Sequence, residues 1–189
     1  MMWDLPVEVK IDEKNIYHIT NKCDYRVVLD VFDILNDNEL SNEEKAICSL
    51  IVFYEELNRE NIYNCFHINE LQEQMFYIIN NGEAEESSKN SPKLMDWKHD
   101  FKLLAPPISK FLGYDVRTPN KFTHWHSFVG AYMEMGDCTF STVVSIRSKR
   151  AKGEKLDKWE SNYIQEHRKM VELPQTLTTE EEEALNSQW

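Results

Sequence analysis

Apolar residues in the first 81 positions alternate at first and then recur at helical spacing. Val7, Val9 and Ile11 alternate with polar residues, a turn-forming run follows at 12–15, and apolar residues return at 16–19, which predicts a β-hairpin. Because two strands alone are marginal in water, we expect this hairpin to lie on the helices that follow. Helical spacing then predicts three helices, whose inward-facing residues are Val27, Val28, Val31, Phe32 and Leu35, then Ala46, Ile47, Leu50, Ile51, Tyr54 and Leu57, then Leu71, Met75, Ile78 and Ile79.

Start and stop signals place the ends of these helices. The first begins near Asp24, and the second at Ser41, where Ser41 and Glu44 form a capping-box sequence that satisfies free amides of the first turn. The third ends at Asn81-Gly82, a suitable C-terminal cap. The polar stretch that follows has no apolar period, which predicts a solvated linker over residues 82–95.

Four more helices are predicted between residues 96 and 173. Gly113 ends the first, and Pro106-Pro107 inside it predicts a kink or two short helices, because each proline removes a backbone donor and clashes with the preceding turn. Thr123 is the expected N-cap of the second helix. The fourth helix is expected to be the longest, ending at Leu173-Pro174. The inward-facing residues of the four are Leu104, Ile108, Phe111 and Leu112, then Trp125, Phe128, Val129, Tyr132 and Met133, then Phe140, Val143, Val144 and Arg147, then Leu156, Trp159, Tyr163, His167 and Met170.

Together these patterns predict a mainly α fold, with six to eight helices in two small helical sub-bundles and a short N-terminal β-hairpin. The expected organisation is a hairpin with three helices over residues 1–81, a linker over 82–95, a helical bundle over 96–173, and a disordered acidic tail over 174–189. Four large side chains are expected to anchor the core: Trp125, Phe128, Trp159 and Tyr163.

Composition narrows the class of protein. With 189 residues, of which 41% are hydrophobic and 12% aromatic, the chain can bury a core, while five glycines and six prolines argue against an all-β sandwich. No apolar run reaches the roughly 18–20 residues of a membrane span, and the N-terminus lacks the features of a signal peptide. The four cysteines form no CxxC pair, which is typical of reduced structural thiols. We expect a soluble cytoplasmic protein without a membrane partner.

The net charge of −12 is concentrated in the first half of the chain. Residues 1–90 carry 7 Lys and Arg against 19 Asp and Glu, whereas residues 91–172 carry 14 against 10. Oppositely charged halves favour docking on each other or head-to-tail self-association. Nucleic acid is not an expected partner, because sequence-independent binding needs a net basic face.

No residue cluster predicts catalysis or a metal site. His124-x-His126 and Cys65-x-His67 are the only close His and Cys pairs, and a helical pair two residues apart points to opposite faces, whereas zinc needs about four convergent ligands. One buried, hydrogen-bonded histidine and one exposed histidine are expected at the first pair. The chain also lacks a GxSxG motif, a glycine-rich phosphate loop and HExxH. We therefore expect no enzyme activity and no cofactor.

The most concentrated positive charge lies between residues 147 and 158. One interpretation is a solvated corner between two helices, partly offset by Glu154 and Asp157. The other is an anchor for an acidic partner surface, such as the N-terminal half of a neighbouring copy. Trp159 lies beside this run, and Trp with Arg is the usual composition of a binding hot spot, although the heptad-like position of Trp159 favours burial. The candidate partner-binding residues are Arg147, Lys149, Arg150, Lys152, Lys155 and Lys158.

Several short motifs occur in a fixed order along the chain and resemble the bacteriophage gene-product-fifteen family of siphophage tail genes over most of residues 5–172. Members of that family have an aspartate-led helix ending in Tyr-Gly-Ile-Asp-Leu, a helix opening with His-Trp-Trp, and a helix ending in Ile-Ser-x-Arg. His126 stands where the family has its second tryptophan. The motifs in this chain are Tyr17-His18-Ile19, Asp24-Tyr25-Arg26, Leu112-Gly113-Tyr114-Asp115-Val116 after Asp100, His124-Trp125-His126-Ser127-Phe128, Val144-Ser145-Ile146-Arg147 and Lys155-Leu156-Asp157-Lys158-Trp159.

The resemblance implies a tail-morphogenesis protein and not an enzyme. The function it implies most directly is a tail assembly chaperone, which would bind the long helical tape measure protein in the cytoplasm of the infected bacterial host and leave as tail tube subunits polymerise. Two alternatives stay open. One is a permanent structural component of the virion tail or baseplate, and the other is an unrelated phage-encoded regulatory or host-interaction protein.

Overall fold

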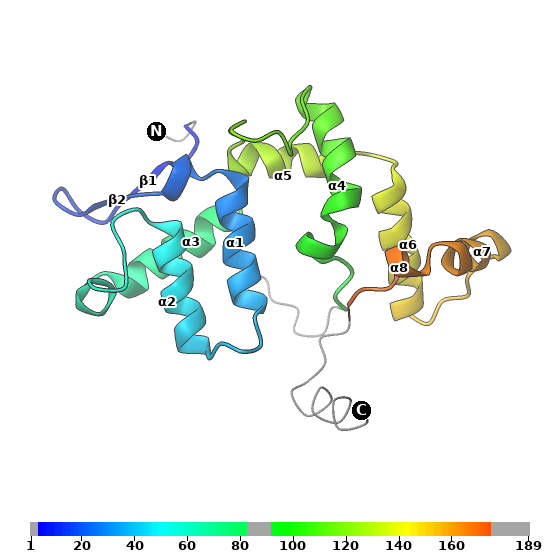
Figure 1. Ribbon diagram of the computed structural model, residues 1–189, viewed down its shortest axis with the longest axis horizontal. Coiled ribbons are helices and arrows are strands. Elements are labelled where there is room, and N and C mark those ends of the chain that lie inside the picture. The colour runs from blue at the N-terminus through cyan, green and yellow to red at the C-terminus, as the bar shows by residue number, and fades with distance from the viewer. Residues whose placement is uncertain (1–3, 83–91, 175–189) are drawn as a thin grey trace. The chain divides into compact units, whose positions relative to one another are not determined.

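The computed structural model describes residues 4–82 and 92–174, and over these ranges the protein is mainly helical with one two-stranded hairpin (Figure 1). The predicted fold class is confirmed. Most of the expected acidic tail and of the expected linker lies outside the described residues, which include only residue 174 of the tail and residues 82 and 92–95 of the linker. The elements in chain order are β1 (Glu8–Lys10), β2 (Ile16–His18), η1 (Thr20–Lys22), α1 (Tyr25–Asn36), α2 (Asn42–Phe53), η2 (Ile62–Asn64), α3 (Ile68–Ile79), α4 (Trp97–Leu112), α5 (Trp125–Met133), α6 (Thr139–Ala151), α7 (Lys158–Glu166) and α8 (Arg168–Val171).

Contacts within the chain define two compact units that interleave along the sequence. Unit 1 comprises residues 1–90 and 104–136, and unit 2 comprises residues 91–103 and 137–189. The structure therefore does not divide at the linker, because α5 and the second part of α4 pack with the N-terminal elements.

α4 is a single helix through Pro106 and Pro107, so of the two outcomes that these prolines predict, two short helices are excluded.

The hairpin opens unit 1 as predicted. β1 and β2 are antiparallel, and Val9 is buried. Two backbone hydrogen bonds extend the pairing: the Ile19 N–H donates to the Val7 carbonyl at 2.9 Å, and the Glu55 N–H donates to the His18 carbonyl at 3.0 Å. The chain just after α2 is thereby tied to β2, which supports two strands that would be marginal alone.

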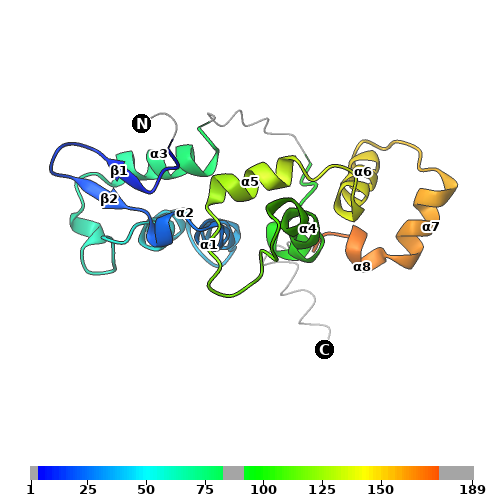
Figure 2. The same cartoon turned by 90° about the horizontal axis from the view of Figure 1, so that it is seen from above.

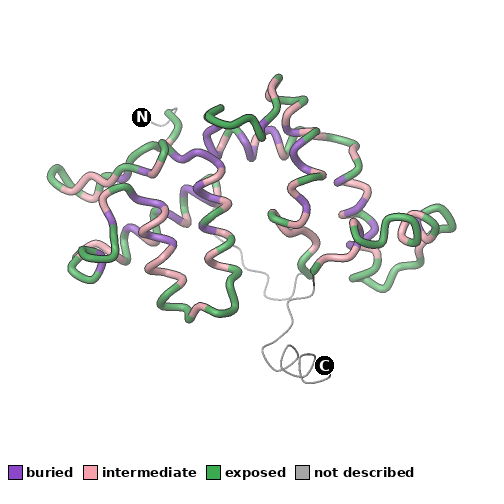
Figure 3. The backbone as a smooth tube through the Cα atoms, viewed as in Figure 1, coloured by how far each residue is buried: buried purple, intermediate pink, exposed green. Residues whose placement is uncertain are grey.

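The predicted starts of α1 and α2 and the predicted end of α3 are confirmed, whereas α2 ends at Phe53, before Tyr54 and Leu57, which were expected to lie on it. Asp24 caps α1 by accepting a hydrogen bond from a backbone N–H of its first turn. Ser41 and Glu44 form the reciprocal capping box of α2. Asn81 and Gly82 follow α3 with positive φ angles of 53° and 82°. The buried faces of these helices (Figure 3) consist of Val27, Val28, Val31, Leu50, Phe53, Leu71, Met75, Ile78 and Ile79.

The chain between the hairpin and α1 has an unusual backbone. Asn21, Lys22 and Cys23 have φ angles of 48°, 55° and 62°, a left-handed conformation that costs L-residues roughly 1–2 kcal/mol each. This turn ends where the chain meets the start of α5, since the Trp125 N–H donates to the Cys23 carbonyl at 2.8 Å. A bond across about a hundred residues of sequence therefore helps to hold the strained turn.

The start of α5 lies over the end of α3. The indole N–H of Trp125 donates to the Ile79 carbonyl at 2.8 Å, and Nε2 of His126 lies 2.8 Å from the Ile78 carbonyl. Carbonyls in the last turn of a helix lack helical donors, so the indole N–H satisfies the Ile79 carbonyl, while the Ile78 carbonyl accepts from the His126 ring in addition to the Asn81 N–H at 3.1 Å. His126 therefore uses its ring to bind the last turn of α3.

Aromatic packing joins α5 to α1. The rings of Phe128 and Tyr25 are stacked, with centroids 4.4 Å apart, and Trp125 meets Phe32 edge-on at 5.8 Å. Trp125 and Phe128 are both buried, as expected of core anchors.

Unit 2 is built on a smaller core around α6, α7 and α8 (Figure 2). The predicted single long helix over 156–173 is wrong. Asp157 caps α7 and fixes its start at Lys158, and His167, with φ −122° and ψ 32°, separates α7 from α8. The core cluster is Val143, Ile146 and Val171, with Leu103, Leu156, Tyr163, Ile164 and Met170 packed against it.

Replacing Trp125 by alanine should destabilise unit 1 by about 3–5 kcal/mol, because it removes a buried ring and leaves the Ile79 carbonyl without its donor. Urea denaturation followed by circular dichroism measures this. Trp159→Ala is the matched control, since Trp159 is 58% exposed and its loss should change stability by less than about 1 kcal/mol. Equal losses in the two variants would contradict the assignment of Trp125 to the core.

Candidate protein-interaction site

Arg147 lies at the centre of unit 2 with every N–H of its guanidinium bonded. Two N–H groups form a bidentate pair with the Asp100 carboxylate, at 2.7 and 2.8 Å. The other three donate to the carbonyls of Leu94, Met170 and Val171 at 3.0, 2.9 and 2.8 Å. A guanidinium has five donors, so none is left for a ligand.

This arrangement corrects one sequence expectation. Arg147 is 6% exposed and Asp100 is fully buried, so Arg147 holds α4, α6 and α8 together and is not a partner-binding residue. The three central family-like motifs lie between Asp100 on α4 and Arg147 near the end of α6. These two residues form an ion pair with each other.

A second polar contact fixes the approach from α6 to α7. The Glu160 carboxylate accepts from the Lys149 ammonium at 2.5 Å and from the Asp157 backbone N–H at 2.9 Å. The Asp157 side chain in turn caps α7 through the Glu160 N–H at 2.7 Å. The hydrogen bond to Lys149 lowers the pKa of Glu160 and raises that of Lys149. Lys149 is thus engaged within the protein, unlike the partner-binding role that its place in the basic run predicts.

The other four candidate residues remain available at the surface. They are exposed, and none of them forms an ion pair with any residue in the described ranges. We call this set the basic corner, and it consists of Arg150, Lys152, Lys155 and Lys158.

Trp159 lies directly after the basic corner and is exposed, so the expectation that it anchors the core is wrong. Trp159 is 58% exposed. Because α7 begins at Lys158, Tyr163 and not Trp159 packs against the core cluster, and Tyr163 itself is only partly buried. The Trp159 and Tyr163 rings are 5.2 Å apart, and Tyr163 and His167 are 4.5 Å apart. These three rings form an aromatic row along α7 whose two ends are open to solvent.

A cavity of about 620 Å³ opens beside the α6 end of the basic corner. Its lining contains four cationic side chains and a single carboxylate. Two of these cations form ion pairs with nearby residues of their own segment: Arg168 with Glu172 at 2.9 Å, and Lys93 with Asp96 at 2.8 Å. Both pairs are exposed. We call it the α6–α8 cavity, and it is lined by Lys93, Arg147, Arg150, Ala151, Arg168, Val171, Glu172 and Leu173.

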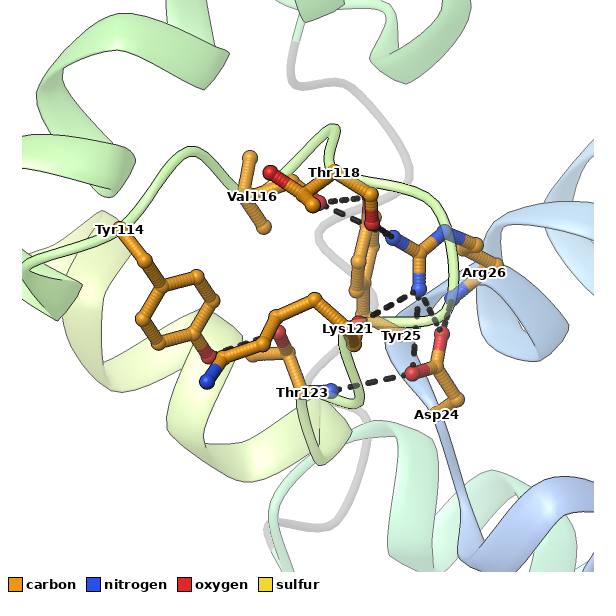
Figure 4. A network of polar contacts seen from close by, with 8 residues as sticks. All are labelled: Asp24, Tyr25, Arg26, Tyr114, Val116, Thr118, Lys121 and Thr123. Carbon is orange, nitrogen blue, oxygen red and sulfur yellow. Dashed lines mark hydrogen bonds and ion pairs between the residues drawn. The ribbon is translucent and has the colours of Figure 1, made fainter.

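Unit 1 contains a corresponding polar network around Arg26 (Figure 4). The guanidinium pairs with Asp24 at 3.1 Å and donates to the carbonyls of Val116, Thr118 and Lys121 at 3.0, 3.2 and 3.1 Å. These bonds pin the loop between α4 and α5 against the start of α1. The Tyr25 hydroxyl donates to the Val116 carbonyl as well, so this part of the family-like Asp-Tyr-Arg motif is structural.

The His124-x-His126 pair is also structural. His124, and not Thr123, is the N-cap of α5: its Nδ1 accepts from the His126 N–H at 3.1 Å, and its Nε2 lies 2.9 Å from the Pro6 carbonyl. Burial lowers the pKa of His124, which keeps Nδ1 free to accept. His126 is half-buried, and not exposed as expected. Within residues 4–82 and 92–174, no three His, Cys, Asp or Glu side chains are grouped to hold a metal ion.

The sequence did contain signals for some features that periodicity missed. Asp157-x-x-Glu160 is a capping-box pattern that marks the true start of α7. The Asp100–Arg147 pair and the contributions of Lys93 and Arg168 to the cavity have no local signal, since they join segments tens of residues apart.

Replacing Asp100 by asparagine should cost about 3–5 kcal/mol, because it leaves the Arg147 charge buried without a counter-ion. Chemical denaturation at pH 7 measures the loss. Asp137→Asn, an exposed position in the same unit, should stay within about 0.5 kcal/mol of the parent protein. A small effect at Asp100 would show that the three carbonyl contacts of Arg147 suffice.

Acidification should destabilise unit 1 through His124. Its folded-state pKa lies below the ordinary value near 6.5, so between those two values the unfolded chain binds more protons and stability falls as the pH is lowered. His124→Asn keeps a capping side chain but cannot titrate, so its unfolding free energy should fall less between pH 7 and pH 5.5, by at most about 1.4 kcal/mol per pH unit. His18, whose pKa is raised by Glu56, acts in the opposite direction and is present in both proteins. Parallel pH profiles would contradict the lowered pKa of His124.

Comparison with known proteins places these features in a family. The family described as Bacteriophage Gp15 protein matches residues 2–173, which is most of the chain, so the protein belongs to this family. No curated protein and no solved structure gives a match. The described helices include none that is long and apolar enough to cross a membrane.

Proposed function

We propose that this member of the Bacteriophage Gp15 family takes part in tail morphogenesis as a tail assembly chaperone. It binds the tape measure protein in the cytoplasm of the infected host and is released as tail tube subunits polymerise. Family membership supports a phage role. The basic corner, together with the exposed Trp159, is the surface that supports binding of a protein partner.

The observation that carries the proposal is the exposure of Trp159 beside four cations that form no ion pair with any described residue. A large ring left 58% exposed is informative, because a chain that can bury Trp125 fully does not lack room for tryptophan in its cores. Tryptophan and arginine dominate the energy of protein interfaces. A helix that presents apolar residues at spacings of three and four, flanked by Asp or Glu, is the partner segment that fits this surface.

The same surface suits reversible binding. Exposed charge pairs contribute roughly 0–1 kcal/mol each and weaken with salt, so most of the affinity would come from the Trp159 ring and from repetition. Many copies along a long helical partner would add avidity without needing a tight single contact. A chaperone that has to leave its partner needs contacts of this kind.

Binding to the tape measure protein tests the proposal. Trp159→Ala, and separately the triple reversal Lys152→Glu, Lys155→Glu and Lys158→Glu, should each weaken co-purification with the tape measure protein at least about tenfold. The controls are Phe111→Ala, whose ring is 57% exposed in unit 1, and Lys102→Glu with Lys110→Glu on α4. Circular dichroism should show the same helical content in all variants.

Mass spectrometry of purified virions separates the chaperone from the permanent tail component. A chaperone should be absent from mature particles, whereas a structural subunit would be present in a fixed copy number. Equal binding by the Trp159 variant and its Phe111 control would contradict the site, and absence of any tape measure binding would contradict the function.

A further inference from the structure

We propose that the acidic run Glu180–Glu183 of this same chain docks in the α6–α8 cavity and masks the Arg150 end of the basic corner. The mask would be released when an acidic partner segment competes for the same cations. The inference deepens the proposed function, on which it rests for the identity of the competing partner. Residues 175–189 lie outside the described part of the protein, and the sequence places the acidic run a few residues after Leu173 of the cavity.

The cavity has the charge to receive a carboxylate-rich segment. Its lining contains four cations and only Glu172 as a carboxylate. Arg147 has no donor left and its charge is balanced by Asp100, whereas Arg150 forms no ion pair with any described residue. Lys93 and Arg168 hold exposed carboxylates three and four residues away. Exposed pairs of this kind are worth only about 0–1 kcal/mol, so these two cations can exchange partners at little cost.

The run also lies within reach of the cavity. Leu173 lines the cavity, and the first glutamate of the run is seven residues further along the chain. An extended chain spans up to about 3.4 Å per residue, so a seven-residue tether reaches about 24 Å from the cavity wall. Short tethers give effective concentrations in the millimolar range, which lets even a weak intramolecular contact compete with a partner in solution.

Charge balance favours this occupant over other parts of the chain. In unit 2 the residues from 91 to 174 carry 11 Lys and Arg against 8 Asp and Glu, and the run supplies four consecutive glutamates. It is the longest uninterrupted run of acidic residues in the sequence. Docking would bring the positive excess of three close to neutrality.

Zero-length carbodiimide crosslinking of the full chain tests the proposal, because it joins only carboxylates and amines that are in contact. In low salt, the monomer should give crosslinked peptides between Glu180–Glu183 and Lys93, and 1 M NaCl should reduce them at least about fivefold. Lys102, exposed on α4 in the same unit, should give at least fivefold less crosslink to the run. Arg150→Gln with Arg168→Gln should reduce the Lys93 crosslink by a similar factor.

A binding measurement gives an independent readout. A labelled peptide of residues 175–189 should bind the full-length variant with all four glutamates changed to glutamine at least about fivefold more tightly than it binds the parent chain. Equal affinities, crosslinks to Lys93 no stronger than to Lys102, or crosslinks found only in dimers would overturn the proposal. Neither experiment uses the tape measure protein, so a negative result here does not contradict the proposed function. Equally, failure to bind the tape measure protein would not contradict the docking of the acidic run.

Discussion

Burying the guanidinium of Arg147 constrains unit 2 more than any other single contact. A cation removed from water is tolerable only if a counter-ion and acceptors replace its hydration, and here Asp100 and three carbonyls do so completely. Those acceptors come from the segment before α4, from α4 itself and from α8. Each must be in place for the charge to be satisfied, so the three segments are energetically coupled although the apolar cluster beneath them is small.

Unit 1 uses a related arrangement at lower cost. Arg26 is partly exposed and takes its carbonyl partners from the loop that ends α4, while Asp24 both pairs with it and caps α1. In each unit an Asp–Arg pair supplies contacts that short helices cannot make among themselves. The motifs around Asp24, His124 and Arg147 are therefore concerned largely with architecture, whereas the Lys155–Trp159 motif supplies two exposed cations and the exposed tryptophan. The cations and the tryptophan available for a partner lie mostly outside those contacts, in the turn that follows α6 and at the start of α7.

Local sequence rules predicted the parts of the fold that depend on neighbouring residues. The hairpin, the Ser41 capping box and the Asn81-Gly82 end of α3 are decided within a few residues, and each is confirmed. The errors occur where a distant partner decides. Trp159 fits a heptad spacing, but the cap at Asp157 and the break at His167 give α7 a different buried face. Arg147 belongs to a basic run in the sequence, yet its partner Asp100 is 47 residues away. Four of the six candidate partner-binding residues are exposed, and their binding of a partner stays a prediction.

The interleaving of the two units has a consequence for synthesis on the ribosome. The first 82 residues emerge with α1, α2 and α3, but Trp125 appears more than forty residues later, and its indole N–H bonds the end of α3 while its backbone N–H bonds the strained turn before α1. At about 5–20 residues per second, the nascent chain waits for several seconds before α5 can cover those surfaces. In unit 2, Asp100 likewise lacks its partner Arg147 until α6 has been synthesised, and Arg147 lacks its carbonyl partners in α8 until that helix follows. The time taken to synthesise the chain as far as α5 therefore sets how long those surfaces stay uncovered.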